Sequence, residues 1–338
     1  MLDLETLDRV DSKSMYKIYD KWAEISKNAY NSNIKIAQFK DVDHVVFVGM
    51  GGSGTLGDIF SSILSKTNIH ISIVKGYLLP KTIDKNSLVI FTSVSGNTAE
   101  TLSAIKDAVK QNYNTISFSS GGLLEKFCIK NNLEFRKIEK IHSPRASFVS
   151  YLYTMLKVLE DIIPVEKNEI INSIKELELL NNKISSKNLT SKNPAINLAQ
   201  EISGIPLIYY PWGLQSAAIR FKNSLQENAK MHVMVEDIVE ASHNGIVSWE
   251  KKSNILPILL QGYDDYIKTK ERWKVVKTYF DKNGINYKEI LSIKGNILSK
   301  ITHLVYLLDY TSIYKAVISD TDPTPVKSID FIKSKLRE

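Results

Sequence analysis

The chain has 338 residues, of which 43% are hydrophobic and 24% charged, so it is expected to form sizeable cores rather than a disordered polymer. Its single cysteine excludes an intrachain disulfide and a cysteine-based metal site, and its longest apolar runs fall short of the roughly 18 to 20 residues that span a bilayer. The formal net charge of +7 comes from scattered lysines, which argues against nucleic acid and favours an anionic small ligand.

The length exceeds the size at which single cores usually stop growing, so two domains are expected. We place the first at residues 1–185 and the second at 186–338, with the polar stretch SSKNLTSKNP at their boundary. The N-terminal residues MLDLETLDRVDSK are acidic and lack the basic start and apolar centre of a secretory signal, which favours a cytoplasmic location and no membrane partner.

In chain order, residues 13–30 carry apolar side chains at three- and four-residue steps, which predicts one amphipathic helix. Short β-branched strands then alternate with helices. We expect strands at 43–49, 70–75, 87–93 and 114–119, and helices at 54–65, 97–111 and 122–131. Strands of nearly continuous apolar character are typical of a parallel sheet that helices cover on both faces, which predicts a doubly wound α/β unit.

Residues 144–180 have a helical pattern. Beyond the polar boundary, short apolar strands again alternate with helices. We expect strands at 205–211, 231–235, 254–260 and 287–293, and helices at 214–227, 264–283 and 299–316. The fold class is therefore α/β, with two doubly wound domains whose parallel sheets are flanked by helices.

Glycines cluster in VFVGMGGSGTLGD, residues 46–58, where a strand gives way to a helix. Such a turn allows close backbone approach and directs unpaired N–H groups at a ligand, as in dinucleotide folds. The acidic ribose partner expected at the end of the next strand is replaced by Lys75, and a Walker A lysine is also absent from the motif. A nucleotide site is therefore disfavoured.

Hydroxyls cluster in the second turn, S-V-S-G-N-T, directly after an apolar strand. Ser93, Ser95 and Thr98 can converge there with the N–H groups of residues 96–98 on one tetrahedral oxyanion, which predicts a phosphate site. The alternative is that Ser95 or Asn97 simply caps the following helix.

The motif S-V-S-G-N-T-A-E-T resembles the phosphosugar-binding signature of the sugar isomerase (SIS) domain superfamily, and G-M-G-G-S-G resembles its first loop, with Gly52 and Ser53 as substrate-binding candidates. The motifs S-P-R-A, Q-E-N-A-K, A-S-H-N and D-P-T-P-V narrow the resemblance to the bifunctional phosphoglucose/phosphomannose isomerases. The matches cover nearly the whole chain in the same order.

The resemblance implies a cofactor-free aldose–ketose isomerase that interconverts glucose 6-phosphate and mannose 6-phosphate with fructose 6-phosphate through an enediolate. It assigns the base to Glu227 and stabilisation of the enediolate to Arg145, whose guanidinium stays charged. It assigns ring opening to His243, contributed across the interface of a homodimer with shared active sites. We expect His44 and His303 to be structural, and no motif supports the remaining histidines.

The resemblance also implies that Lys333 assists near the ring oxygen or hydroxyls and that Thr324 lines the sugar site, although Lys327 and Lys335 are nearby. No histidine or carboxylate motif has metal-ligand spacing, so neither a metal nor another cofactor is expected. Two alternatives stay open: a non-catalytic SIS module that senses a sugar phosphate, and an isomerase of a pentose phosphate or glucosamine phosphate.

Overall fold

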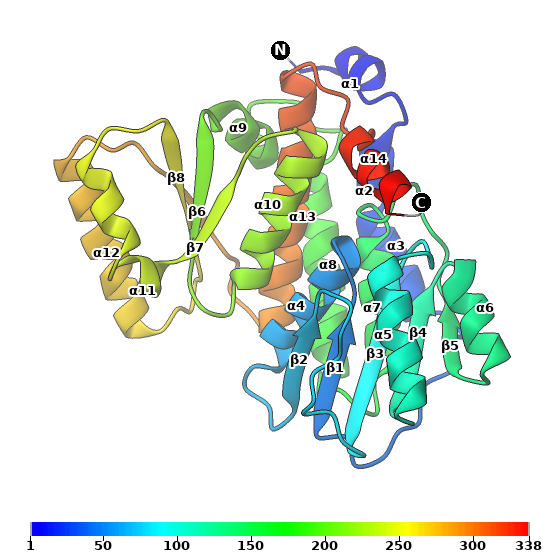
Figure 1. Cartoon of the computed structure of the whole chain (residues 1–338). Coiled ribbons are helices and arrows are strands. Elements are labelled where there is room, and N and C mark those ends of the chain that lie inside the picture. Colours follow the sequence, from blue (N-terminus) through cyan, green and yellow to red (C-terminus); the bar gives the residue numbers. More distant parts are fainter. Residues whose placement is uncertain (1, 337–338) are drawn as a thin grey trace.

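Two parallel sheets lie on either side of a central layer of helices (Figure 1). The structure is a computed structural model and describes residues 2–336. The first sheet has the strand order β2-β1-β3-β4-β5 and the second the order β7-β6-β8-β9. Every pairing within both sheets is parallel. The predicted fold class is confirmed.

Helices cover both faces of the first sheet. Alternate side chains of each strand point to opposite faces, so each strand contributes to two clusters. Its strands are β1 (His44–Val48), β2 (His70–Val74), β3 (Ser87–Ser93), β4 (Asn114–Ser119) and β5 (Glu134–Lys137). On one face Val45 and Phe47 pack toward α4 (Gly52–Leu64) and α7 (Phe148–Val158) in the central layer. On the other, Val46 and Val48 pack toward α5 (Ala99–Lys110) and α6 (Gly122–Lys130). Cys128 is fully buried in this second cluster, as expected of a core residue.

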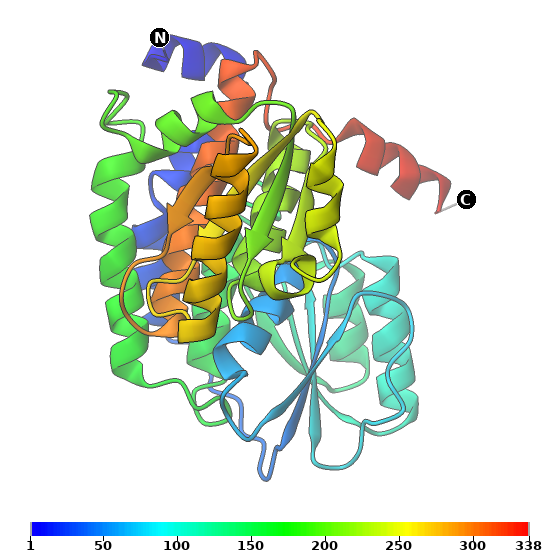
Figure 2. The same ribbon diagram turned by 90° about the vertical axis from the view of Figure 1, so that its left-hand side faces the viewer.

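The second sheet follows the same logic. Its strands are β6 (Ile205–Tyr210), β7 (Met234–Asp237), β8 (Ile255–Gln261) and β9 (Lys288–Leu291). Ile208 and Ile258 face α10 (Gln215–Asn228) and α13 (Ile297–Ile318) in the central layer. Tyr209 and Leu259 face α12 (Ile267–Lys282), which lies on the outer side with α11 (Ile238–Ala241) and the 3-10 helix η1 (Gly245–Glu250) (Figures 1 and 2).

The central layer is one continuous core that crosses the predicted domain boundary. The 22-residue helix α13 packs on α10, on α8 (Lys167–Ile184) and on α9 (Pro194–Glu201). The N-terminal helices α1 (Leu4–Val10), α2 (Met15–Tyr19) and α3 (Trp22–Tyr30) pack against the same layer. Apolar residues of both sheets and of these helices therefore share one cluster, and the division at residue 185 stays a prediction.

Three differences from the sequence expectations have identifiable causes. The helix predicted at 13–30 breaks at Asp20, whose carboxylate accepts hydrogen bonds from Tyr310 and Ser186. Strand β7 begins at Met234, not at residue 231, because Lys230 adopts a φ of 58° and turns the chain after α10. Strand β5 was not predicted because it is a four-residue edge strand of sequence EFRK.

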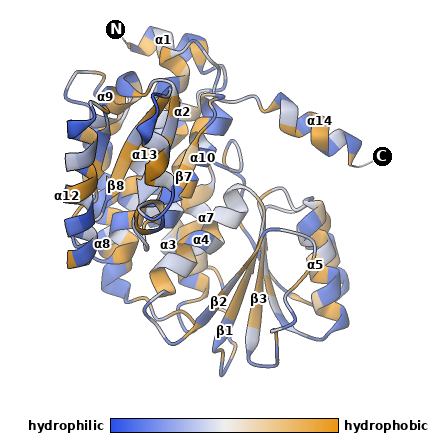
Figure 3. Cartoon of the chain, turned by 60° about the vertical axis from the view of Figure 1, so that its left-hand side comes forward, coloured by the Kyte–Doolittle hydropathy of each residue, from blue (hydrophilic) through white to orange (hydrophobic). Residues whose placement is uncertain are grey.

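The C-terminal helix α14 (Lys327–Lys335) extends away from the body, and none of its residues is buried (Figures 2 and 3). Apolar and polar residues alternate around it, and Phe331 is 65% exposed. Within residues 2–336, no helix combines the length and apolar character that crossing a membrane requires.

Candidate active site

The hydroxyl-rich turn lies at the carboxyl end of the central strand β3. Ser93 and Thr98 bring their hydroxyl oxygens to 2.9 Å of each other, and the N–H of Gly96 donates to Ser93 Oγ at 3.1 Å. Gly96 has a φ of 66°, and a Cβ there would lie 1.7 Å from the carbonyl oxygen of Gly121, so only glycine fits. The turn is held in one shape with Ser95 exposed toward solvent.

Neither Ser95 nor Asn97 caps α5, so the capping interpretation is wrong. The N-cap residue is Thr98, and its side chain makes no capping hydrogen bond. Ser95 Oγ accepts from the N–H of Asn97 at 3.3 Å, and Asn97 Oδ1 accepts from the N–H of Leu123 at 3.0 Å. The hydroxyls of Ser93 and Thr98 are therefore paired at the helix start, where N–H groups and the helix dipole favour an anion.

The glycine loop lies at the same sheet edge because β1 and β3 are parallel neighbours. A Cβ on Gly49 would approach the carbonyl oxygen of Thr92 to 3.0 Å, so the glycine loop begins directly beside the end of β3. Helix α4 begins at Gly52, with Ser53 buried in its first turn. At the end of β2, Lys75 forms an ion pair with Asp58 at 2.6 Å, so this lysine is a structural partner of α4.

Arg145 is buried, with 5% of its surface exposed, and it connects three segments of the chain. Its Nε donates to Asn228 Oδ1 at 2.7 Å and its Nη1 to Glu227 Oε2 at 3.0 Å. Its Nη2 donates to the carbonyl oxygens of Pro323 and Thr324, at 2.6 and 2.9 Å. A guanidinium has five N–H groups, and four of them make the bonds above. The fifth, the second N–H of Nη1, has no acceptor among residues 2–336, and its nitrogen is the one that also donates to Glu227.

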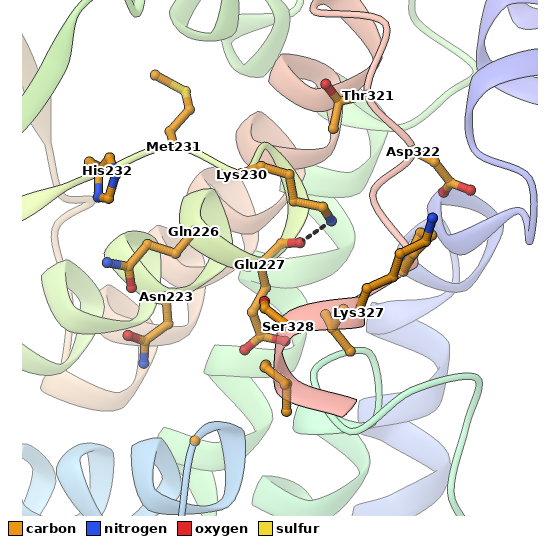
Figure 4. A pocket seen from close by; sticks show the side chains of 14 residues that line it. Asn223, Gln226, Glu227, Lys230, Met231, His232, Thr321, Asp322, Lys327 and Ser328 are labelled. Atoms are coloured by element: carbon orange, nitrogen blue, oxygen red, sulfur yellow. Dashed lines mark hydrogen bonds between the residues drawn. The ribbon is translucent and has the colours of Figure 1, made fainter. Parts of the chain in front are cut away.

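Glu227 lies near the C-terminal end of α10 and lines a pocket of about 820 Å³ (Figure 4). Its side chain is 28% exposed, so it is supported by Arg145 and still reachable from the pocket. Asn223 and Gln226 of the same helix line one side, and Asp322 and Lys327 the other. Gly51 of the glycine loop also lines the pocket, which places that loop and Glu227 around one space.

A buried ion pair supports the backbone beneath Arg145. Arg220 donates from Nη2 to Asp309 Oδ2 at 2.6 Å and to the carbonyl oxygen of Arg145 at 2.8 Å. Asp309 has no exposed surface, and it also accepts a hydrogen bond from Ser224. Although burial opposes the charge of Arg220, the Asp309 carboxylate raises the pKa of this arginine, so its guanidinium stays charged.

Thr324 belongs to a loop that meets Arg145 through its backbone. Its Oγ1 is buried and has no hydrogen-bond partner within residues 2–336. Asp322 fixes the loop by accepting from the N–H of Thr324 at 2.9 Å and from Ser12 Oγ at 2.6 Å. Within residues 2–336, Thr324 therefore has an unpartnered hydroxyl, while its carbonyl oxygen accepts a hydrogen bond from Arg145.

Two of the four expected catalytic residues lie apart from this cluster within one chain. Lys333 is exposed on α14, whereas Lys327 at the start of that helix lines the pocket. His243 is exposed in the turn after α11, on the outer side of the second sheet, and it is not among the residues around Glu227 (Figure 1). The single chain therefore brings Glu227, Arg145 and Gly51 together without Lys333 or His243.

Three of the other histidines lie in structural or pocket positions. His44 bonds the hydroxyls of Ser87 and Ser72 at 3.1 and 2.9 Å, and burial lowers its pKa. Burial also lowers the pKa of His303 to about 4. Both are structural, as expected. His232, which no motif supported, lines the pocket with Glu227.

Sequence reasoning also missed Lys230, Asp322 and Arg220. Lys230 and Asp322 lie inside the quoted motifs Q-E-N-A-K and D-P-T-P-V, so their proximity to Glu227 and Thr324 was an available signal. Arg220 had none, because its partner Asp309 is 89 residues away in sequence. No group of three or more His, Cys, Asp or Glu side chains that could hold a metal occurs among residues 2–336.

Two family models match the chain. The SIS domain model matches residues 38–156, and the model described as the bacterial phospho-glucose isomerase C-terminal SIS domain matches residues 191–336. The first match contains the glycine loop, the hydroxyl-rich turn and Arg145, and the second contains Glu227, His243 and Thr324.

Known proteins align over nearly the full length. A bifunctional phosphoglucose/phosphomannose isomerase from Caldicellulosiruptor bescii is 33% identical over 93% of this chain and 94% of its own. A protein of the same name from Aquifex aeolicus is 28% identical over 96% of this chain and 99% of its own. The C-terminal domain of glucosamine-fructose-6-phosphate aminotransferase from Francisella tularensis superposes with a TM-score of 0.67 at 16% identity, over 91% of this chain and 96% of that chain.

Proposed function

The chain belongs to the family of bifunctional phosphoglucose/phosphomannose isomerases, and from this membership we propose that it interconverts glucose 6-phosphate and mannose 6-phosphate with fructose 6-phosphate. The observation that carries the proposal is the pairing of Glu227 with Arg145 at 3.0 Å beside a pocket that the glycine loop also lines. A base next to a buried cation is what proton transfer through an enediolate requires.

In this proposal the hydroxyl-rich turn and the glycine loop bind the phosphate, through Ser93, Ser95, Thr98, Gly52 and Ser53. Hydroxyls and helix N–H groups can donate to phosphate oxygens without placing a cation that would compete with Arg145. The phosphate then anchors the sugar at the sheet edge, and its reacting carbons extend toward Glu227.

Proton transfer follows from the arrangement of Glu227 and Arg145. The Glu227 carboxylate takes the proton from the carbon next to the carbonyl, and the electrons move onto the carbonyl oxygen to give an enediolate. The remaining N–H of Arg145 Nη1 can donate to that oxygen. The hydroxyl proton on the carbon that lost its hydrogen moves to the former carbonyl oxygen. Glu227 then returns its proton to the former carbonyl carbon, which gives the ketose from the aldose or the reverse. Thr324 Oγ1 can bond a sugar hydroxyl nearby.

We propose that a homodimer completes the site, with His243 of each subunit acting in the pocket of the other. His243 is exposed and is not among the residues that line the pocket with Glu227, which supports this arrangement. A histidine changes charge near neutral pH, which suits proton transfer during ring opening. Lys333 stays a proposed participant on the same reasoning, because α14 is exposed in the single chain.

The activity is tested by a coupled assay with glucose 6-phosphate and mannose 6-phosphate, run in heavy water and with a metal chelator. We expect turnover of both substrates, no effect of the chelator, and deuterium at the carbon that receives the proton. Binding of both sugar phosphates without turnover would favour the sensing module instead. Turnover of a pentose phosphate alone would redirect the substrate assignment.

A further inference from the structure

Lys230 occupies an unusual position at the end of α10. It follows the last helical turn in a left-handed conformation, with φ of 58°, and its side chain turns back toward the helix (Figure 4). Its ammonium group donates to the carbonyl oxygen of Glu227 at 2.5 Å and approaches that of Pro323 at 3.4 Å. It also lines the pocket.

The two carbonyls belong to the two segments that frame the site. The carbonyl of Glu227 lies in the last turn of α10 and receives no backbone N–H within residues 2–336, so it needs a donor from a side chain or solvent. The carbonyl of Pro323 also accepts from Arg145 Nη2 at 2.6 Å. Lys230 and Arg145 therefore both donate to the carbonyl oxygen of Pro323, Lys230 from the end of α10 and Arg145 from the core.

This placement opposes the ordinary preference of a lysine for solvent. Burial and the neighbouring Arg145 guanidinium lower the pKa of Lys230, while Asp322 and Glu227 favour its charge. A four-carbon side chain could extend into water at little cost. The bonds to two main-chain oxygens, together with the charge at a helix C-terminus, offset that loss of hydration.

Resting on the proposed function, we propose that Lys230 is a positioning residue of the isomerase. It fixes the loop that contains Pro323 and Thr324 against the end of α10, and so holds the Glu227 carboxylate and the remaining N–H of Arg145 at their working separation. The residue acts through these groups and does not bind the phosphate.

The test compares Lys230→Met, which keeps the aliphatic stem, with Lys230→Arg, which keeps the charge and donors. Lys268→Met is the matched control, because Lys268 pairs with Glu271 on the surface of α12. We expect kcat of Lys230→Met to fall about 10- to 100-fold, as for a misplaced catalytic group, while KM changes less than about threefold. Lys230→Arg should recover at least part of kcat, and Lys268→Met should match the wild type.

The ratio of activities on glucose 6-phosphate and mannose 6-phosphate gives a second readout. A shifted loop moves the Thr324 hydroxyl, so the two epimers should be affected unequally, whereas a general loss of stability would lower both in proportion. Unfolding followed by circular dichroism should show the same urea midpoint for Lys230→Met and wild type.

Three results would overturn the inference alone: wild-type kcat in Lys230→Met, a loss confined to KM, or a loss of kcat that follows a lower urea midpoint and is not recovered by arginine. An inert wild-type protein would overturn the proposed function first, so the two failures are distinguishable.

Discussion

Arg145 and Glu227 form an ion pair of unequal exposure: the guanidinium side chain is 5% exposed and the carboxylate side chain 28%. The cation is fixed by Asn228 and two loop carbonyls, whereas the carboxylate accepts one hydrogen bond within residues 2–336 and lines the pocket. The more constrained partner is the one that stays still in the proposed mechanism, and the freer partner is the one proposed to reach a substrate proton. This asymmetry fits a base beside a preorganised electrostatic site.

Replacing Glu227 with Gln should abolish proton transfer and keep most of the packing. We expect kcat to fall by about two to four orders of magnitude, the usual contribution of a positioned general base. The measurement is steady-state turnover of both sugar phosphates. Glu178→Gln, on an exposed part of α8, should behave as wild type, and full turnover of Glu227→Gln would refute the base assignment.

Replacing Thr98 with Val should weaken phosphate binding. The valine keeps the shape and removes one hydroxyl that we assign to the anion, so KM should rise about 10- to 100-fold, as for loss of a hydrogen bond to a charged group. Thr101→Val is the matched control on the same helix, because its buried Oγ1 has no partner within residues 2–336. Equal kinetics for the two variants would remove Thr98 from the phosphate site.

Mixing two inactive variants tests the shared active site. Glu227→Gln and His243→Ala should each be nearly inactive alone. A symmetric dimer that exchanges subunits at random would recover roughly a quarter of wild-type activity, since half the dimers then contain one intact site. Titration of one variant with the other, followed by assay, gives the recovery. No recovery after verified exchange would place the ring-opening group within one chain, where His232 lines the pocket.

Breaking the buried pair of Arg220 and Asp309 should destabilise the fold. Asp309→Leu leaves an unpaired guanidinium that is 2% exposed, and we expect the free energy of unfolding to fall by about 3 to 5 kcal/mol. The double variant Arg220→Met with Asp309→Leu should recover about 2 kcal/mol or more, because no charge is left buried. Urea denaturation measures both. Glu271→Gln, in an exposed pair, should change stability by less than about 0.5 kcal/mol.

Acid should destabilise the protein partly through His303. Burial lowers its folded-state pKa from 6.5 to about 4, so the unfolded chain binds the proton first as the pH falls. Stability from this residue is complete above pH 6.5 and is lost progressively toward pH 4. Between pH 7.5 and 4.5, the wild type should lose about 2 kcal/mol more than His303→Gln, after discounting for partial exposure. Parallel urea midpoints over this range would contradict the assignment.

The sequence predicted most strands and the positions of the glycine-rich and hydroxyl-rich turns because these depend on local patterns. The apolar run at 87–93 and the hydroxyls that follow it specify a buried strand and its turn without reference to distant residues. The motif resemblance likewise selected Glu227 and Arg145, which the structure joins at 3.0 Å. The break at Asp20 could not be read in this way, because its bonds to Tyr310 and Ser186 come from segments far along the chain.

By itself the sequence determined the fold class, the order of the elements and the residue types available for isomerase chemistry. Only the tertiary structure decided which groups meet: that the carbonyl of Pro323 lies between Arg145 and Lys230, that Arg220 finds Asp309, and that Lys327 rather than Lys333 lines the pocket of a single chain. The physical reason is that the two kinds of interaction act over different separations in the sequence. Periodicity and turn propensity act over a few residues, whereas buried charges and unsatisfied carbonyls are matched across the folded core, where the cost of leaving them unpaired is greatest.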